Sequence, residues 1–226
     1  VKDDTKIEYE MKTETIETLL SDGRAYYSNT VNYPFFLGSS DVESELNQRY
    51  ADMISEFQSH VGDSAEADEA YKERLNDPNL DCIDEYGQKT VPIPFYDDVD
   101  SEVIYNERNV LSIKETYSMW SGGMHAYHSE KALNFDISTG KELTYLDILD
   151  GTNAEIDAVL RLYLEKFVYS PTEVQIEDLK QYTAYTLCDD GLCFYYNVGD
   201  AVSRQEIVIP YTSEDTYIIT VTDLLN

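Results

Sequence analysis

The chain has 226 residues, of which 42% are hydrophobic and 12% aromatic, so it can bury a core and is not a disordered acidic segment. Its 45 acidic and 16 basic residues give a net charge of −29, which makes nucleic acid and anionic membrane surfaces poor partners. A cationic protein would be attracted. The alternative explanation of the charge is solubility alone.

A β-hairpin is expected first along the chain. Ile7, Tyr9 and Met11 alternate with charged residues, which is typical of a half-buried strand. A polar turn then leads to a return strand over residues 25–33, which Pro34 is expected to end.

A long amphipathic helix is predicted next, capped by Ser40 or Asp41 and closed by Gly62. Its apolar residues recur at helical spacing on one face: Val42, Leu46, Tyr50, Met53, Phe57 and Val61. An irregular insertion is expected to follow over about 63–100. Its first part, up to Asn76, is predicted to be a surface helix, and the rest a long loop of a kind that is often functional or mobile.

The second half of the chain is expected to mix strands with short helices. In chain order these are strands around 103–105, 111–119 and 132–137, a turn at 138–141, a helix over 144–151 capped by Thr144, a helix from the capping box 152–155, a helix over 172–180, a hairpin between two cysteines, and strands ending at Pro210 and over 217–221. The helix after the capping box is expected to bury Ile156, Val159, Leu160, Tyr163 and Phe167.

This order of elements indicates an α+β fold, with helices packed on one face of a mainly antiparallel sheet. We expect two subdomains that share a core, residues 1–100 and residues 101–226.

The cysteines carry a further prediction. Cys188 and Cys193 flank the turn signal Asp189–Leu192, and a hairpin there would bring them to cross-strand distance. We predict a disulfide between them, which would fit an oxidising compartment; two reduced thiols are the alternative. Cys82 is expected to be free or to pair with another chain.

A set of short motifs runs through the chain in a fixed order. They are Tyr33-Pro34-Phe35-Phe36, a helix over 42–57 that carries Asn47, Gly122-Gly123-Met124-His125, Phe135-Asp136 with Thr139-Gly140-Lys141, Leu143 to Leu149, and Ile207 to Tyr211. Together they resemble the PdaC/RsiV family of extracytoplasmic modules of unassigned activity. Members lie beside the catalytic domain of the peptidoglycan deacetylase PdaC and form the lysozyme-sensing outer domain of the anti-sigma factor RsiV.

The resemblance covers most of the chain but departs from the family at three places. Met124 stands where the family commonly has Ala, residues 197–201 replace a segment that usually contains Tyr and Gly, and the insertion has no counterpart. The resemblance implies an extracytoplasmic, non-enzymatic binding or sensor domain on the surface of a bacterial cell, expected to be Gram-positive. Membrane anchoring is expected through a segment absent from this chain.

The resemblance implies that ligand contacts lie in variable loops, and we expect such loops beside the stretch from Gly122 to Leu143. The candidate binding residues are therefore Trp120, Met124, His125 and Tyr127. Combined with the net charge of −29, the resemblance leads us to expect a cationic protein such as lysozyme as the partner.

Catalysis is supported less well, because no complete catalytic motif is present. The alternative function is a cell-wall or polysaccharide hydrolase, which would need two facing carboxylates, one with a raised pKa. Glu107, Glu115 and Asp136 are the acids nearest to predicted strand faces, although each is expected to be a solvated strand residue.

No metal and no cofactor are expected. His125 and His128 could join Asp136 at a metal ion, but His125 is better explained as a hydrogen-bonding group of its turn. The run Asp97–Asp100 lacks the glycine and the distal Glu of a calcium loop, so a charged loop is the preferred interpretation.

Overall fold

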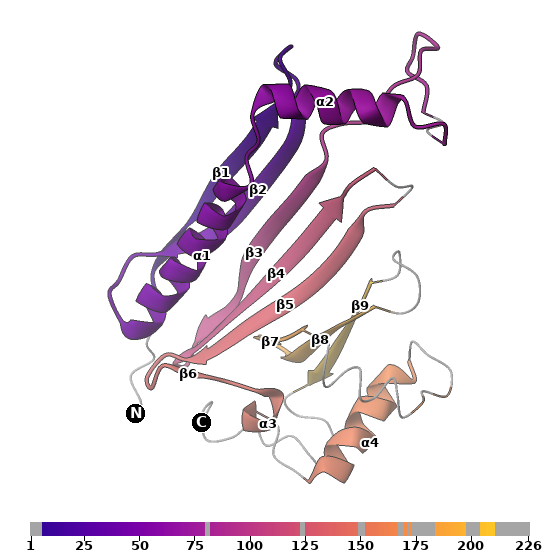
Figure 1. The fold of residues 1–226 in the computed structure, drawn as a ribbon. Helices are drawn as coiled ribbons and strands as arrows, with labels where there is room; N and C mark the ends of the chain where they lie inside the picture. Colours follow the sequence, from indigo (N-terminus) through magenta and orange to yellow (C-terminus); the bar gives the residue numbers. More distant parts are fainter. Residues whose placement is uncertain are drawn as a thin grey trace.

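The computed structural model describes residues 6–79, 82–122, 125–148, 152–166, 170, 172, 184–197 and 204–210. These residues form a six-stranded sheet, a three-stranded sheet and helices, so the predicted α+β class with mainly antiparallel sheet is confirmed (Figure 1).

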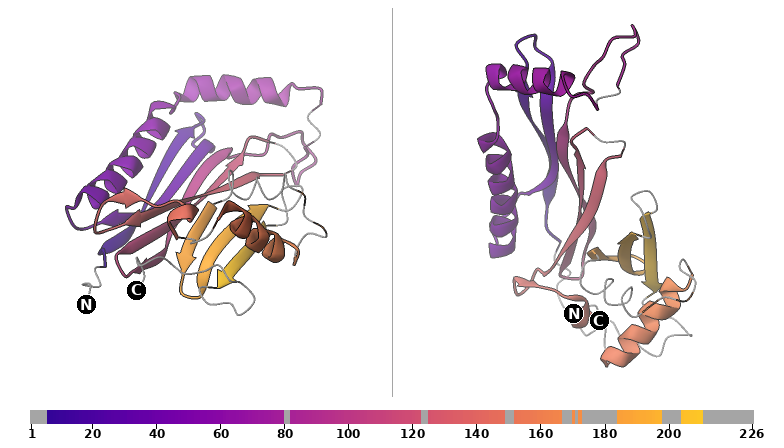
Figure 2. Two further views of the ribbon diagram at one scale, coloured as in Figure 1. Left: turned by 90° about the horizontal axis from the view of Figure 1, so that it is seen from below. Right: turned by 45° about the vertical axis from the view of Figure 1, so that its right-hand side comes forward.

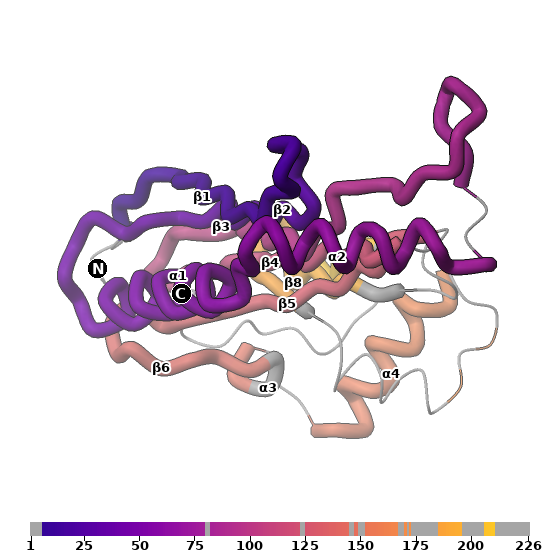
Figure 3. The backbone as a smooth tube through the Cα atoms, turned by 45° about the horizontal axis from the view of Figure 1, so that its top comes forward, coloured from indigo at the N-terminus to yellow at the C-terminus, as the bar shows by residue number. Residues whose placement is uncertain are grey.

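The large sheet has the strand order β1-β2-β3-β4-β5-β6. Its strands are β1 (Tyr9–Leu19), β2 (Ala25–Phe36), β3 (Tyr96–Glu107), β4 (Val110–Trp120), β5 (Tyr127–Asp136) and β6 (Lys141–Glu142). Neighbouring strands are antiparallel except β2 and β3, which run parallel with Val31 opposite Val99. Parallel neighbours need a long crossover, and here it contains the helices α1 (Asp41–Ser59) and α2 (Ser64–Leu75). Figure 3 shows α1 and α2 as consecutive helices on one side of the sheet.

The N-terminal hairpin forms as predicted, but its details differ. Tyr9 and Met11 are exposed, and Ile16 is the buried apolar residue of β1. β2 does not end at Pro34 but continues to Phe36, with Pro34 opposite Met11. The paired register of β2 with β3 covers only Val31 and Asn32, so beyond it β2 has one strand neighbour, and proline is tolerated at such an edge.

α1 begins as the sequence predicts. Ser40 and Glu43 form a capping box, and the buried face consists of Val42, Leu46 and Tyr50. The helix ends at Ser59 rather than Gly62. The backbone N–H of the C-cap His60 donates to the carbonyl of Phe57 in a tighter 3₁₀-type turn, and Val61 is consequently exposed.

Two polar side chains of α1 fix it to the sheet. The amide of Asn47 accepts a hydrogen bond from the Phe36 N–H and donates one to the Phe36 carbonyl, both at 2.9 Å. The guanidinium of Arg49 donates from Nε and Nη2 to the carboxylate of Glu115, at 3.2 and 2.7 Å. Glu115 lies on β4 with 0% exposure, and the hydroxyl of Tyr117 also donates to it. Each oxygen of this carboxylate therefore accepts at least one hydrogen bond, and Arg49 balances its charge.

The expected irregular insertion is shorter than predicted. Residues 64–75 form the predicted surface helix, capped by the Asp63 side chain, but Tyr96 already begins β3. The assignment of Asp97–Asp100 to a charged loop was wrong, because Val99 is buried beside Val31 in the sheet. β3 runs through residue 100, where the boundary between subdomains was expected; that division stays a prediction.

A second layer packs on the other face of the large sheet, against β3, β4 and β5 (Figure 2). It contains β7 (Ala184–Cys188), β8 (Gly191–Asn197) and β9 (Arg204–Pro210), with α4 (Asn153–Leu164) packed on them and the short α3 (Tyr145–Ile148) beside them. Leu111 and Ile113 face α1, whereas Val110 packs with the second layer, since alternate strand residues point to opposite faces. The expected placement of helices on one face therefore describes α1 but not α4.

Buried polar groups connect the two sheets. The Ser112 hydroxyl donates to the Asn134 side chain and accepts from the Leu187 N–H, and the Asn134 amide donates to the Tyr185 carbonyl. In α4 the predicted capping box of Thr152 is confirmed, and four of the five predicted core residues are buried: Ile156, Val159, Leu160 and Tyr163. Phe167, the strand over 217–221 and, apart from Thr172, the helix over 172–180 lie outside the described residues.

Replacing Arg49 by Met should lower the free energy of unfolding by about 3 kcal/mol, because the buried Glu115 carboxylate loses its charged partner. Urea unfolding at pH 7 measures this loss. Lys72→Met is the matched control, because its ion pair with Glu69 is exposed and should contribute at most about 0.5 kcal/mol. Equal effects of the two substitutions would contradict the structural role of the buried pair.

Candidate functional site

The predicted binding residues lie where β4 leads into β5. Trp120 is the last residue of β4 and Tyr127 the first of β5, with its side chain 61% exposed. His125 is exposed between them, whereas Met124 lies outside the described residues. The structure therefore brings Trp120, His125 and Tyr127 to one end of the sheet.

Trp120 is held by aromatic neighbours rather than presented alone. Its ring centroid lies 5.6 Å from that of Phe95 and 6.3 Å from that of Tyr96. The guanidinium of Arg74, on α2, lies over the Phe95 ring, 4.3 Å from its centroid. Arg74 also donates to the Ser121 carbonyl at 3.0 Å. These contacts fix α2 to the end of the sheet.

Gly122 is required by the same packing. Its φ of +97° is unfavourable for other residues, and an added Cβ would lie 2.8 Å from Nη1 of Arg74 and 3.0 Å from Cε1 of Phe95. The first glycine of the Gly-Gly motif is thus explained by close approach between α2 and the β4 end.

The Asp136 to Lys141 motif is explained by turn chemistry. The Asp136 carboxylate accepts from the Ser138 N–H, the Ser138 hydroxyl and the Thr139 hydroxyl at 2.6–2.9 Å, and Gly140 adopts a φ of +74°. Burial alone would raise the pKa of Asp136, but the bonds from Ser138 and Thr139 outweigh it and lower the pKa. Asp136 therefore serves as a turn acceptor.

The other acids that could have catalysed hydrolysis also have partners of their own. Glu107 pairs with Lys6 at the surface, at 2.5 Å, and Glu115 is the buried partner of Arg49. The ring of His128 is hydrogen-bonded to the Ser118 hydroxyl at 2.8 Å. Within the described ranges, no group of three or more His, Cys, Asp or Glu side chains is arranged to hold a metal ion.

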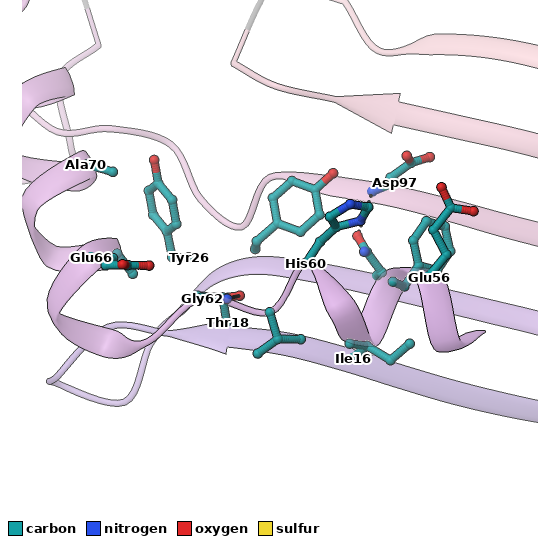
Figure 4. A pocket seen from close by; sticks show the side chains of 14 residues that line it. Ile16, Thr18, Tyr26, Glu56, His60, Gly62, Glu66, Ala70 and Asp97 are labelled. Atoms are coloured by element: carbon teal, nitrogen blue, oxygen red, sulfur yellow. Dashed lines mark hydrogen bonds between the residues drawn. The ribbon is translucent and has the colours of Figure 1, made fainter. Parts of the chain in front are cut away.

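A pocket that the sequence did not reveal lies between the end of α1, the start of α2 and strands β1–β3 (Figure 4). Its cavity volume is about 460 Å³. It is lined by Ile16, Thr18, Tyr26, Tyr27, Asn29, Glu56, Phe57, His60, Val61, Gly62, Glu66, Ala67, Ala70 and Asp97. These residues come from five elements and the α1–α2 link, so no local motif could have signalled the pocket.

The pocket is anionic. Figure 4 shows Glu56, His60 and Asp97 at one end and Glu66 at the other, and no lining residue is Lys or Arg. Burial, then the charges of Asp98 and Glu56, raise the pKa of Asp97 above its ordinary value. Burial and the charges of Asp97 and Asp98 likewise raise the pKa of Tyr27. A cation in the pocket would relieve this repulsion.

The predicted cysteine pair lies on the hairpin of β7 and β8. Cys193 is buried and its Sγ lies 2.8 Å from Sγ of Cys188, as two thiols in this structure. Burial, then the neighbouring Cys188, raises the pKa of the Cys193 thiol. The sulfurs are thus adjacent, as the sequence indicated, and the disulfide stays a prediction.

The disulfide has a direct chemical test. Because Cys188 and Cys193 are adjacent, air-oxidised protein unfolded in guanidinium should react with a thiol reagent at Cys82 alone, and after reduction at all three cysteines. Three reactive thiols before reduction, under oxidising conditions, would contradict the bond. Cys82→Ala, which should leave no reactive thiol before reduction, is the control.

Replacing Asp136 or Asp97 by Asn should change the free energy of unfolding at pH 7 in opposite directions. A lowered folded pKa stabilises the protein above the ordinary pKa of 3.8 and loses that effect as the pH falls, so Asp136→Asn should cost about 1 kcal/mol at pH 7 and less near pH 3. A raised folded pKa destabilises the protein at high pH, so Asp97→Asn should add roughly 0.5 kcal/mol at pH 7 and nothing near pH 3. Urea unfolding at both pH values measures these changes; shifts of equal sign would be inconsistent with the two environments.

Comparison with known proteins finds a family match over part of the chain. Residues 20–128 match the family model described as deacetylase PdaC, and this segment holds every lining residue of the pocket except Ile16 and Thr18. No curated protein sequence matches the chain.

Two solved structures of the DUF3298 family share the fold. The one from Bacteroides fragilis has a TM-score of 0.64 and 21% identity, and the one from Pseudomonas aeruginosa has a TM-score of 0.54 and 15% identity. Each comparison covers 92% of both chains, and at such identities the likeness concerns the fold alone. The family resemblance seen in the sequence is confirmed: the chain carries a PdaC-type module over residues 20–128, within a fold that it shares with DUF3298 family proteins.

Proposed function

We propose that this protein is an extracytoplasmic, non-enzymatic binding or sensor domain of a bacterial cell-envelope protein that recognises a cationic protein such as lysozyme. The PdaC-type module supports the envelope setting, and the net charge of −29 supports a cationic partner. Anchoring is proposed to come from a membrane segment outside this chain; none of the described helices has the length and hydropathy to cross a membrane.

The anionic pocket is the observation that carries the binding role. The rings of Tyr26, Tyr27 and Phe57 in the pocket are half-buried. The lining contains carboxylates but no Lys or Arg. A concave apolar surface with a few polar groups is the usual form of a binding site. The candidates Trp120 and Tyr127 lie beyond β3 at the same end of the sheet and are proposed to extend the contact surface.

A hydrolase remains the second candidate because of one feature of the pocket. Glu56 and Asp97 line the same aromatic cavity, and their mutual repulsion contributes to the raised pKa of Asp97, as required for a general acid. This reading predicts that purified protein releases reducing ends from cell-wall glycan and that Asp97→Asn abolishes the release. Absence of any release would eliminate it.

Titration with hen lysozyme tests the binding function. At about 20 mM salt we expect saturable binding, because long-range attraction between the −29 protein and a basic protein is weakly screened there. Raising the salt to about 150 mM should lower the association rate constant and leave the dissociation rate constant nearly unchanged. Surface plasmon resonance measures both rate constants.

The control is an α-lactalbumin of similar fold and size but acidic charge, which should not bind. No binding of lysozyme at low salt would remove lysozyme as the partner. Equal binding of several unrelated basic proteins would show that charge alone, and not a shaped site, governs recognition.

A further inference from the structure

The pocket under α2 combines an aromatic wall with carboxylates, and this combination limits which ligands fit it. Its lining residues Ile16, Thr18 and Ala67 are buried, and the Thr18 hydroxyl accepts from the Gly62 N–H at 3.2 Å. Its walls are the half-buried rings of Tyr26, Tyr27 and Phe57. A ligand that enters must therefore offer an apolar stem to the rings.

The carboxylates of the pocket define the head group. Glu56 and Glu66 are exposed at its rim and Asp97 is half-buried, so an entering cation would meet acids at both ends of the cavity (Figure 4). A ligand with an apolar stem and a positively charged head satisfies both requirements, as the long basic side chains do.

We propose that this pocket binds an arginine side chain presented by a basic protein. The proposal rests on the proposed function for the nature of the partner. The planar guanidinium can stack flat on an aromatic ring and donate in a fork to both oxygens of a carboxylate, whereas an ammonium interacts with either group only as a point charge.

Two arginines of the protein already lie over aromatic rings. Arg24 lies 5.1 Å from the Tyr71 ring centroid while it pairs with Asp22, and Arg74 lies over Phe95. A cavity of about 460 Å³ also falls within the range of about 300–1,000 Å³ typical of organic ligands rather than single ions.

The first test uses the full chain, isotopically labelled for NMR, and N-acetyl-arginine methylamide as the probe. Amide shifts should change at Tyr26, Tyr27, Gly62 and Asp97, with a dissociation constant of about 1 mM, and the neutral isostere N-acetyl-citrulline methylamide should bind at least about tenfold more weakly. Equal binding of the two probes, shifts confined to other surfaces, or no binding of either would overturn the proposal.

Variants separate the pocket from the overall charge. Glu56→Gln with Asp97→Asn should weaken arginine-probe binding about tenfold, whereas Glu8→Gln with Glu142→Gln removes the same charge at the opposite end of the sheet and should leave it within about twofold. Ala70→Leu keeps the charge and fills the pocket from α2, so it should also block binding. Equal losses in the two double variants would contradict a pocket; the amide spectrum of each variant verifies its fold.

The same variants distinguish failure of this inference from failure of the proposed function. If lysozyme binds all variants equally, the protein is a binding domain but the pocket does not take the arginine. If the arginine probe binds the pocket and lysozyme does not bind at all, the site is supported and lysozyme is the wrong partner.

Discussion

The ion pair between Arg49 and Glu115 is the constraint on which the rest of the structure depends. A carboxylate with 0% exposure is unstable in a protein interior unless charged or hydrogen-bonding groups reach it. Arg49 supplies the charged partner from α1, and Tyr117 supplies a hydroxyl from the same strand. The central strand β4 is thus completed only when the crossover helix is in place.

This link holds α1 on the sheet and so sets where the crossover continues toward α2. The turn at His60 to Gly62 directs the chain into α2, and Arg74 on α2 stacks on Phe95 and bonds to Ser121 at the end of β4. The crossover is consequently fastened to the sheet at both ends, and the space left between its two helices and the strands is the anionic pocket. The pocket is a product of how a parallel pair of strands must be connected.

Local signals in the sequence predicted the elements whose stability is local. The capping boxes at Ser40 and Thr152 involve residues three positions apart, and the Asp136 turn is complete within a few residues. Asp97 to Asp100 was misjudged because its charges indicate a loop, whereas its strand state depends on Val31, far away in the sequence. The pocket was missed for the same reason, since Ile16 and Asp97 meet only in the folded chain.

The stretch from Trp120 to Leu143, predicted to hold binding residues, has mainly structural roles in the fold. Gly122 and Asp136 have structural roles, and Trp120 belongs to the packing that holds α2. Its Gly-Gly motif lies within the segment that matches the PdaC family model, while the proposed binding pocket is lined by other residues. The motifs that mark the fold and the residues proposed to contact a ligand are therefore separate here.

Native-state hydrogen exchange tests the central claim most directly, namely that α1 and β4 form one cooperative unit joined by Arg49 and Glu115. The account predicts that amides of α1 around Leu46 to Tyr50 and of β4 around Leu111 to Glu115 open with the same free energy and the same denaturant dependence. If the α1 amides exchanged through a separate, much less stable opening while β4 stayed protected, the crossover would not be a fixed wall of the pocket, and the account would be wrong.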